Sequence, residues 1–537
     1  MAGGGIDRVL ERRIATLIAS RERAALTGGR RGVEREALRV STAGRISARP
    51  HPAALGSALT HPHITTDFSE SLIELVTPTF NDNSALQQYL GDLHQFVHQR
   101  LDGELLWAPS MPAPLTGDAD LPIADYGVSH RGRFKEVYRR GLLTRYGGMM
   151  QAIAGIHFNY SFPDKFWPLW AEVERTGDSG AALRSEAYMA LVRNFRRYGW
   201  LVSYLFGSSP SMCRSFLQGR SAPDLKAHAD GTMTGEHATS LRMSDLGYRN
   251  RSQTAVYVSA NSLNDYLKDL VSAVLTMNPA FEALGVKVKG EYRQLNAGVL
   301  QISNEYYTYI RPKRVPRAGE NMCQALNRAG VEYVEVRSLD CNSLEPTGTE
   351  LATLCFLEAM LALFLFKDSP PISASEQEEF DHNHVQVARR GREPGLTLRR
   401  DGRDVPLTDW LAELLDSMQG LCEVLDEDQS HAPYEFSLQL QEAKLRDPQL
   451  TPAARQLREL RERQEGFVAR ALRLSAQHQE QLLKHHQASA GVDATLAEES
   501  AASVIEQERL EKNDQGSFDE YIGQQMDKYR TLRLAGR

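Results

Sequence analysis

Acidic side chains occupy strand-like runs of this sequence in a pattern that could bind a metal ion. The run GVEREALRV carries Glu34 and Glu36, and the run SLIELVTP carries Glu74 between Leu72 and Val76. Side chains alternate between the two faces of a strand, so Glu34 and Glu36 are predicted to share one face, about 7 Å apart along the strand. Clustered carboxylate oxygens of this kind are the natural ligands of a hard cation such as Mg²⁺.

Two later runs show the same alternation with other polar side chains. In GIHFNYSF, His157 and Asn159 share one face, and in VEYVEVRSL, Glu335 and Arg337 share one. A sheet with one side in water is the ordinary explanation for any single strand of this kind. The set fits that explanation less well, because a solvated face usually carries Thr, Lys, Gln and Ser. If these faces line one cavity, their carboxylates would repel one another unless cations lay between them.

Basic residues close to these runs indicate what such a cation would help to hold. The segment YIRPKR places Arg311, Lys313 and Arg314 at the end of a predicted strand, GVLQISNEYYTYIRP. Carboxylate-bound Mg²⁺ with Arg and Lys is the equipment of phosphoryl transfer, although a solvated turn also explains the segment taken alone. The glycine clusters at 3–5 and 27–32 lack the order of a phosphate-binding loop, so metal and side chains would have to hold the phosphates.

The elements that must position these residues divide the chain of 537 residues into three zones. Residues 1–110 hold two strand-like runs between helical stretches, residues 111–345 mix helices with short strands, and residues 346–537 are almost wholly helical in pattern. Apolar residues at positions 6, 10, 14 and 17 predict an amphipathic opening helix. Thr451 followed by Pro452 predicts one long polar helix that ends near His486, and the last fifty residues predict one or two exposed helices.

Composition limits the class of protein. Apolar residues make up 42% and charged residues 24%, as in a soluble protein with a large core, and the net charge of −7 argues against a nucleic-acid-coating role. Five scattered cysteines without CxxC spacing indicate a reducing compartment and no structural zinc. The most apolar run, Leu351–Phe366, is short for a membrane span and carries Glu358, so we expect a buried core helix. Without a membrane segment or a signal peptide, the expected location is the cytoplasm.

Longer segments resemble the glutamate–cysteine ligases of proteobacteria. They are RRGVEREALRV with HPAALGSALTHPHITTDFSESLIELVTP, SHRGRFKEVYRRGLLTRYGGMMQAIAGIHFNYSF, YLFGSSPSMC, TSLRMSDLGY, EYYTYIRPKR, VEYVEVRSLD and GREPGLTL, in the family's order from about residue 30 to about 400. The resemblance implies an α+β fold similar to glutamine synthetase, in which a curved antiparallel sheet forms a funnel surrounded by many helices. It also implies a catalytic core over residues 1–400. Beyond about residue 405 no family motif matches, and the helical pattern predicts a helical C-terminal region over 401–537 that packs on this core.

The resemblance implies a reaction as well. ATP would phosphorylate the γ-carboxylate of glutamate, and the α-amine of cysteine would attack the γ-glutamyl phosphate to give γ-glutamylcysteine, the first step of glutathione synthesis. Mg²⁺, or Mn²⁺ in its place, would be the cofactor, with ATP as co-substrate. The partners would be the small molecules glutamate, cysteine and ATP, with no nucleic acid and no membrane, and the sequence is compatible with a monomer.

The family's site positions carry over to this sequence where its motifs match. The metal-binding positions match Glu34, Glu36, Asp67, Glu74, His157 and Glu335. The cysteine-binding positions match Tyr138, Gln151, Asn159, Arg242, Tyr248 and Tyr307. Arg337 matches a position near the transferring phosphoryl group, so Arg337 and Glu335 are the expected catalytic residues. Arg311 and Lys313, together with Arg337, are expected near the nucleotide phosphates.

Simpler explanations stand beside these assignments. Strand alternation does not predict Asp67 as a site residue, and a role as a turn or helix cap would explain it. A lone histidine such as His157 is more often a core residue. Cys341 differs from the family's pattern, and a small, partly buried side chain explains it best. A ligase with a different amine acceptor is the rival function within enzymes. An interaction protein that binds a partner through its polar helices at 451–537 is the rival from another class.

Overall fold

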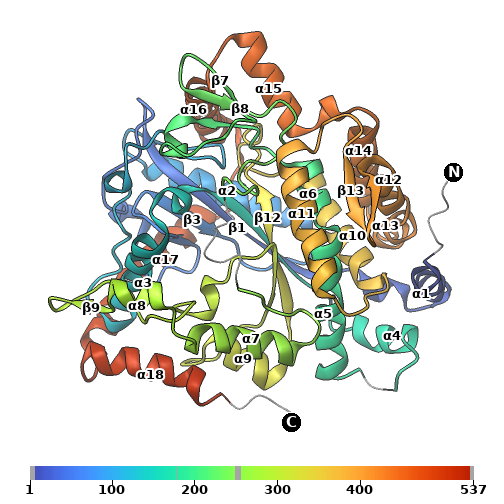
Figure 1. Cartoon of the computed structure of the whole chain (residues 1–537), viewed down its shortest axis with the longest axis horizontal. Coiled ribbons are helices and arrows are strands. Elements are labelled where there is room, and N and C mark those ends of the chain that lie inside the picture. Colours follow the sequence, from blue (N-terminus) through green and yellow to red (C-terminus); the bar gives the residue numbers. More distant parts are fainter. Residues whose placement is uncertain (1–6, 178, 248–255, 533–537) are drawn as a thin grey trace.

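The computed structural model describes residues 7–177, 179–247 and 256–532, and an antiparallel sheet of seven strands lies at its centre (Figure 1). The strand order is β11–β12–β5–β1–β3–β2, and β4 also pairs with β1. The strands are β1 (Arg30–Ser41), β2 (Ile64–Thr66), β3 (Leu72–Val76), β4 (Glu104–Leu106), β5 (Gly155–Ser161), β11 (Ile310–Lys313) and β12 (Tyr333–Asp340). Helices pack around this sheet, which confirms the expected α+β class.

The register of the sheet decides which polar side chains meet. Glu34 on β1 lies opposite His157 on β5, and Glu36 lies opposite Glu74 on β3. Residues directly opposite each other in antiparallel strands share a face, so these four side chains project to the same side of the sheet. On the next strand, β12, Glu335 lies opposite Asn159 of β5, and this extends the polar face across four neighbouring strands.

The opposite face of the sheet is mostly apolar, apart from buried arginines of β1 such as Arg31 and Arg35, and is covered by helices. Val33, Ile156, Phe158 and Val336 are buried there, and α2 and α6 pack against strands of the sheet. The helices that precede and surround this layer are α1 (Arg8–Ala19), α2 (Asn83–Arg100), α3 (His130–Tyr146), α4 (Phe166–Val173), α5 (Ala181–Tyr198), α6 (Trp200–Phe206), α7 (Leu263–Leu275), α8 (Pro279–Leu284), α9 (Met322–Ala329) and α11 (Ala374–Arg390). The α1 helix confirms the predicted opening helix, with Leu10 and Leu17 buried.

The apolar run forms helix α10 (Leu351–Phe366), which confirms the predicted core helix. It is apolar on all sides, as expected for a helix enclosed by protein. Its single charge, Glu358, is fully buried and pairs with the guanidinium of Arg31 on β1. Asn83 and Tyr434 also donate to this carboxylate, at 2.9 and 2.7 Å. Within the described ranges, every helix is too short or too polar to span a lipid bilayer.

The C-terminal third is helical and packs on the elements already described. Its helices are α12 (Leu407–Asp416), α13 (Gln419–Asp426), α14 (Pro433–Arg446), α15 (Pro452–Arg463), α16 (Phe467–His485), α17 (Val492–Asn513) and α18 (Phe518–Arg530). Helix α14 contacts α10, α16 contacts α2 and β4, and α18 contacts α3 and α7. The expected boundary at residue 400 falls at the turn between β13 (Thr397–Arg400) and β14 (Arg403–Pro406). The division at 400 stays a prediction.

The long polar helix predicted from Thr451 to about His486 is wrong, because the chain breaks between α15 and α16. Gln464 adopts a left-handed backbone with φ of 52°, and Gly466 precedes the first residue of α16. A Cβ atom at position 466 would fall on the carboxylate of Asp230, so glycine lets this side chain pack against the turn and a larger residue would make it shift. The neighbouring backbone N–H of Phe467 donates to Thr232 at 2.8 Å, which fixes the turn.

The predicted strand over residues 298–312 is also largely wrong, because only Ile310–Lys313 pairs in the sheet. The backbone of the preceding stretch bonds elsewhere: Val299 donates to Thr276 and Leu300 to Ala273, at 2.9 and 3.0 Å. The remaining strands form two small sheets separate from the central one. They are β6 (Ser211–Cys213) with β7 (Lys226–Ala227) and β8 (Thr232–Thr234), and β9 (Lys287–Val288) with β10 (Glu291–Tyr292).

Candidate active site

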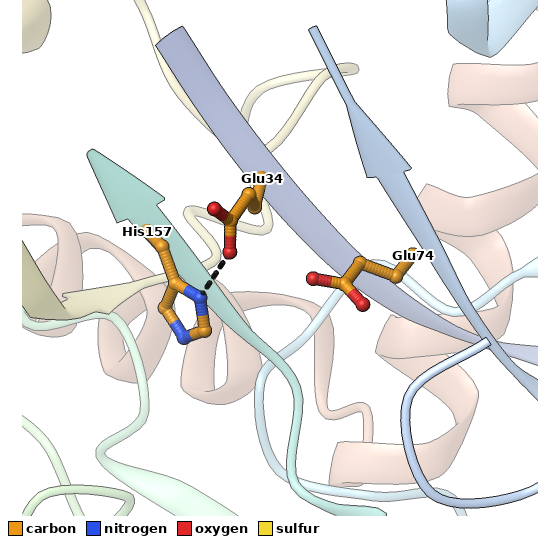
Figure 2. A group of neighbouring side chains, drawn as sticks. All are labelled: Glu34, Glu74 and His157. Atoms are coloured by element: carbon orange, nitrogen blue, oxygen red, sulfur yellow. Dashed lines mark hydrogen bonds and ion pairs between the residues drawn. The ribbon is translucent and has the colours of Figure 1, made fainter. Parts of the chain in front are cut away.

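Glu34 lies at the middle of the polar face and is held by two side chains of β5. Its Oε2 lies 2.9 Å from Nδ1 of His157 (Figure 2). Its Oε1 accepts a hydrogen bond from Nδ2 of Asn159 at 2.9 Å. Burial alone would raise the pKa of Glu34, but the His157 hydrogen bond and the charges of His157 and Lys313 together lower the pKa below its ordinary value. Glu34 is therefore held as a carboxylate that points across the face.

Glu74 faces this pair from β3, as Figure 2 shows. One donor atom from each of Glu34, Glu74 and His157 lies within 4.8 Å of the others. Burial, and then the negative charges of Glu34 and Asp67, raise the pKa of Glu74 well above its ordinary value. These acids therefore repel one another as they stand, and a cation among them would remove the repulsion.

Glu36 and Asp67 complete the acidic side of the site. Oε2 of Glu36 accepts the backbone N–H of Gly155 at 2.7 Å, and its Oε1 lies 3.9 Å from Nε2 of His157. Burial, and then the charge of Asp67, raise the pKa of Glu36. Asp67 follows β2, and its charge acts on both Glu36 and Glu74. The structure thus brings together the acids that the sequence assigned to a metal.

Glu335 lies on the basic side of the same face. Its Oε1 accepts from Nη1 of Arg337 at 3.1 Å and from Nζ of Lys313 at 3.5 Å, and it lies 3.8 Å from Nδ1 of His157. Burial would raise the pKa of Glu335, but the charges of Lys313 and Arg337 lower it well below its ordinary value. Oε2 of this buried carboxylate makes no hydrogen bond in the described part of the chain. An acidic half and a basic half therefore meet at His157.

The donor set fits a hard divalent cation. Carboxylate oxygens with one imidazole nitrogen suit Mg²⁺ or Mn²⁺, and no cysteine takes part. All five cysteines are unpaired, and Cys341 is fully buried, in agreement with its simpler explanation. A cation among these residues would relieve the repulsion at Glu74 and would offer a partner to Oε2 of Glu335, which makes no hydrogen bond among the described residues.

Arg311 is placed differently from its expected role. Its Nη2 donates to the backbone carbonyls of Asn304 at 2.8 Å and of Tyr306, while its Nη1 stays 4.0 Å from Oε2 of Glu335. This guanidinium ties residues 304–306 to β11. A contact of Arg311 with nucleotide phosphates stays a prediction, and Nζ of Lys313 approaches Glu335 more closely, at 3.5 Å.

The residues assigned to cysteine binding fall into several places. Tyr307 donates to Oε1 of Gln151 at 3.2 Å, so these two meet. Asn159 donates a hydrogen bond to Glu34 inside the acidic cluster. Tyr138 lies on α3, where burial, and then the charges of Glu305 and Asp67, raise its pKa. Tyr248 lies outside the described residues. The roles of these residues stay predictions.

Arg242 is buried near the C-terminal end of β12, beside Asp340, an acid that was not predicted as a site residue. Its Nη2 donates to the carbonyl of Arg337 at 2.9 Å, and its Nη1 lies 3.6 Å from Oδ1 of Asp340. Asp340 also accepts from the backbone N–H of Ser208 at 2.8 Å and from the hydroxyl of Ser240 at 2.9 Å. Asp340 therefore anchors the segment that carries Arg242 to the central sheet.

Sequence alternation missed Asp340 and two basic residues of α3. A β-bulge between Val336 and Leu339 shifts the alternation, so Asp340 lies opposite Gly155 and joins the polar face. Lys135 and Arg139 lie four residues apart on α3 and face the acids. Burial lowers the pKa of Lys135 and the negative charge of Glu74 opposes this, while Arg139 donates to the carbonyl of Asp67. Helical spacing in SHRGRFKEVYRRG was the available signal for the two basic residues.

The sequence of this chain is similar to those of known glutamate–cysteine ligases. The family model described as glutamate-cysteine ligase matches residues 14–387. The chain is 47% identical over 520 residues to a glutamate–cysteine ligase of Azotobacter vinelandii, covering 96% of this chain and 98% of that one. A glutamate–cysteine ligase of Pseudomonas aeruginosa PAO1 is 45% identical, covering 96% and 97% of the two chains.

Solved structures give the same result for the fold. The crystal structure of a glutamate–cysteine ligase from Francisella tularensis in complex with AMP superposes with a TM-score of 0.87 at 34% identity, covering 94% of this chain and 98% of that one. A bifunctional glutathione synthetase from Pasteurella multocida superposes with a TM-score of 0.68 at 22% identity over 89% of this chain and 55% of that one, and it shows a shared fold.

Proposed function

The chain belongs to the glutamate–cysteine ligase family, and on that premise we propose how its buried side chains serve the reaction. The protein is a ligase that uses ATP to join the γ-carboxyl of L-glutamate to the α-amine of L-cysteine, giving γ-glutamylcysteine, the first step of glutathione biosynthesis. A ligase with a different amine acceptor is not favoured, because the relatives are themselves glutamate–cysteine ligases.

The proposed route passes through γ-glutamyl phosphate. A carboxylate is a poor acyl donor, because its leaving group would be oxide, and phosphorylation replaces that group with phosphate. The observation that carries the proposal is the convergence of Glu34, Glu74 and His157 beside the basic pair Lys313 and Arg337. A divalent cation held by Glu34, Glu74 and His157, with Glu36, Asp67 and Glu335 close by, would neutralise charge between the two anionic substrates.

Arg337 and Lys313 act on the transferring phosphoryl group in this proposal. Both cations meet at Oε1 of Glu335, at 3.1 and 3.5 Å, so one buried carboxylate sets the position of the two charges. Positioned charge of this kind stabilises the phosphoryl transition state, and each direct contact contributes on the order of 3 kcal/mol. Glu335 and His157 are 1% and 4% exposed, so the floor of the site excludes water, which would hydrolyse an acyl phosphate.

Cysteine is proposed to bind on the Arg242 side of the face. A guanidinium suits the cysteine carboxylate, and Tyr307 with Gln151 offers further polar contacts nearby. The relative from Francisella tularensis holds AMP, which supports ATP as the nucleotide substrate here. Five unpaired cysteines favour a reducing compartment such as the cytoplasm as the site of the reaction.

The test follows phosphate release and product together. Purified full-length protein with Mg²⁺ and ATP is expected to release phosphate at an appreciable rate only when glutamate and cysteine are both present. Mass spectrometry of the same mixture should show γ-glutamylcysteine, and glycine in place of cysteine should give little product. Rapid phosphate release without amino acids, and no γ-glutamylcysteine, would contradict the proposal.

A further inference from the structure

A large pocket lies away from the acidic cluster, between the β7–β8 hairpin, the turn after α11 and helix α15. Its volume is about 870 Å³, within the range of small-molecule sites. Figure 1 shows β7, β8 and α15 together at one end of the molecule, beyond the central sheet. None of the residues assigned to the metal, to cysteine or to the nucleotide phosphates lines this pocket.

The pocket wall combines apolar surface with two arginines. Leu457 and Leu460 of α15, with Pro394 and Pro448, supply the apolar part. Arg392 donates its Nε to the carbonyl of Ala238 at 3.4 Å and its Nη2 to the carbonyl of Glu236. Arg461 donates to the carbonyl of Leu457 in its own helix, at 3.2 Å.

Neither guanidinium has a carboxylate within 4 Å among the residues that the structure describes, although the lining contains acids. Asp224 pairs with Arg389 at 2.6 Å, and Glu465 pairs with Arg473 at 2.8 Å.

Two further lining acids, Asp230 and Asp447, accept hydrogen bonds from Thr232 and Gln449. Glu236 is exposed and offers its carbonyl to Arg392. The remaining lining acids, Asp230, Glu236 and Asp447, equal the lining bases Lys226, Arg392 and Arg461 in number, so the positive charge is local to the two arginines and is not an excess over the whole pocket.

The two arginines also act on each other. Burial, and then the charge of Arg461, lower the pKa of Arg392 to about 10. Two like charges beside an apolar wall repel, and an anion placed between them would relieve the repulsion while its body covers Leu457 and Leu460.

We propose that this pocket is a second ligand site, which binds an organic anion made of an apolar body and one carboxylate, sulfonate or phosphate group. The anionic group lies between the guanidinium groups of Arg392 and Arg461, and the body lies against Leu457, Leu460 and Pro394. This site is separate from the ligase centre, so its occupancy and the ligase reaction can be measured independently.

The experiment uses 8-anilinonaphthalene-1-sulfonate, an aromatic sulfonate, as the probe on the full-length protein. Calorimetry and fluorescence should show one saturable site, and Arg461→Gln should weaken it about ten-fold, the loss of one charged contact. Arg461→Glu should weaken it further. Arg458→Gln is the matched control, because Arg458 is exposed on the same helix and does not line the pocket.

Competition tests the chemistry of the site. Phenyl phosphate should displace the probe, and benzyl alcohol, which has the ring without the charge, should not. Arg461 is exposed, so both of its variants should keep the wild-type melting temperature and the wild-type rate of γ-glutamylcysteine formation. Equal affinity of the probe for the wild-type protein and both Arg461 variants, or equal displacement by benzyl alcohol, would overturn the proposal.

Discussion

The imidazole of His157 meets the carboxylate of Glu34 across two neighbouring strands, with Nδ1 2.9 Å from Oε2. The two residues lie directly opposite each other in the β1–β5 register, so the contact is a consequence of strand pairing. The contact also helps to explain why the pKa of Glu34 is lowered although the pKa of the neighbouring Glu74 is raised. One strand register thus provides an ionised ligand at the centre of the acidic cluster.

Replacing Glu74 with Gln should separate stability from activity. The substitution removes one of several mutually repelling acids, so the melting temperature in chelator should stay the same or rise. The rate should fall about a hundred-fold or more, the loss expected for one charge-stabilising contact. Thermal melts with EDTA and with Mg²⁺ check the first part, because the rise that Mg²⁺ gives in the wild type should shrink.

The matched control for Glu74 is Glu498→Gln, an exposed glutamate of α17. It should keep both the wild-type rate and the wild-type response to Mg²⁺. Full activity in Glu74→Gln, with an unchanged response to Mg²⁺, would remove Glu74 from the cation site.

Asp340→Asn should weaken cysteine binding through Arg242. The variant keeps a similar shape but removes the charge 3.6 Å from Nη1 of Arg242. We expect the KM for cysteine to rise about ten-fold while the KM for ATP changes less than two-fold. Asp245→Asn is the control, because Asp245 pairs with Arg389 at the surface. An equal rise in both KM values would mean that Asp340 supports the whole site and not the cysteine side.

Glu345 predicts a pH dependence of stability outside the active site. Burial, and then the charge of Glu350, raise its pKa to about 7 from an unfolded value of 4.5. The folded state therefore holds the proton more tightly, so stability is lost as the pH rises from about 4.5 through 7. Because the side chain is only partly buried, the loss should be on the order of 1 kcal/mol.

Urea unfolding of Glu345→Gln measures this term. The variant should be more stable than the wild type at pH 8, and the difference should disappear near pH 4.5. A difference that is constant over this range, or that grows toward low pH, would show that Glu345 is not the group responsible.

Glu358→Ala should be one of the most destabilising substitutions in the core. It leaves the guanidinium of Arg31 buried and unpaired, and it also removes the acceptor of Asn83 and Tyr434. Breaking a buried pair in this way costs about 3–5 kcal/mol, measured by urea unfolding. Glu442→Ala, which breaks a surface pair with Arg446, should cost less than about 0.5 kcal/mol. Similar losses in the two variants would contradict the prediction.

Much of the polar face could be predicted because it rests on uninterrupted strands. Simple alternation paired Glu34 with Glu36 on β1, His157 with Asn159 on β5 and Glu335 with Arg337 on β12, and the register of the sheet brings these faces together. Which strands pair, and in which register, is a property of the whole sheet. The family resemblance was needed to bring in Asp67, which lies outside any strand.

The errors have local physical causes that alternation does not record. The bulge after Val336 moves Asp340 onto the polar face, so a fixed two-residue period loses it. The break at Gln464 depends on a left-handed residue and on the close approach of Gly466 to Asp230. Both features depend on contacts between segments far apart in the chain. The sequence offers one local signal, Gly466, and only for the break.

The most direct test of the account is anomalous diffraction from crystals grown with Mn²⁺, a non-hydrolysable ATP analogue and glutamate. We predict a Mn²⁺ peak within about 2.5 Å of side-chain atoms of Glu34, Glu74 and His157, with the terminal phosphate facing Arg337. A peak held elsewhere in the protein, with these three side chains contacting only one another, would contradict it.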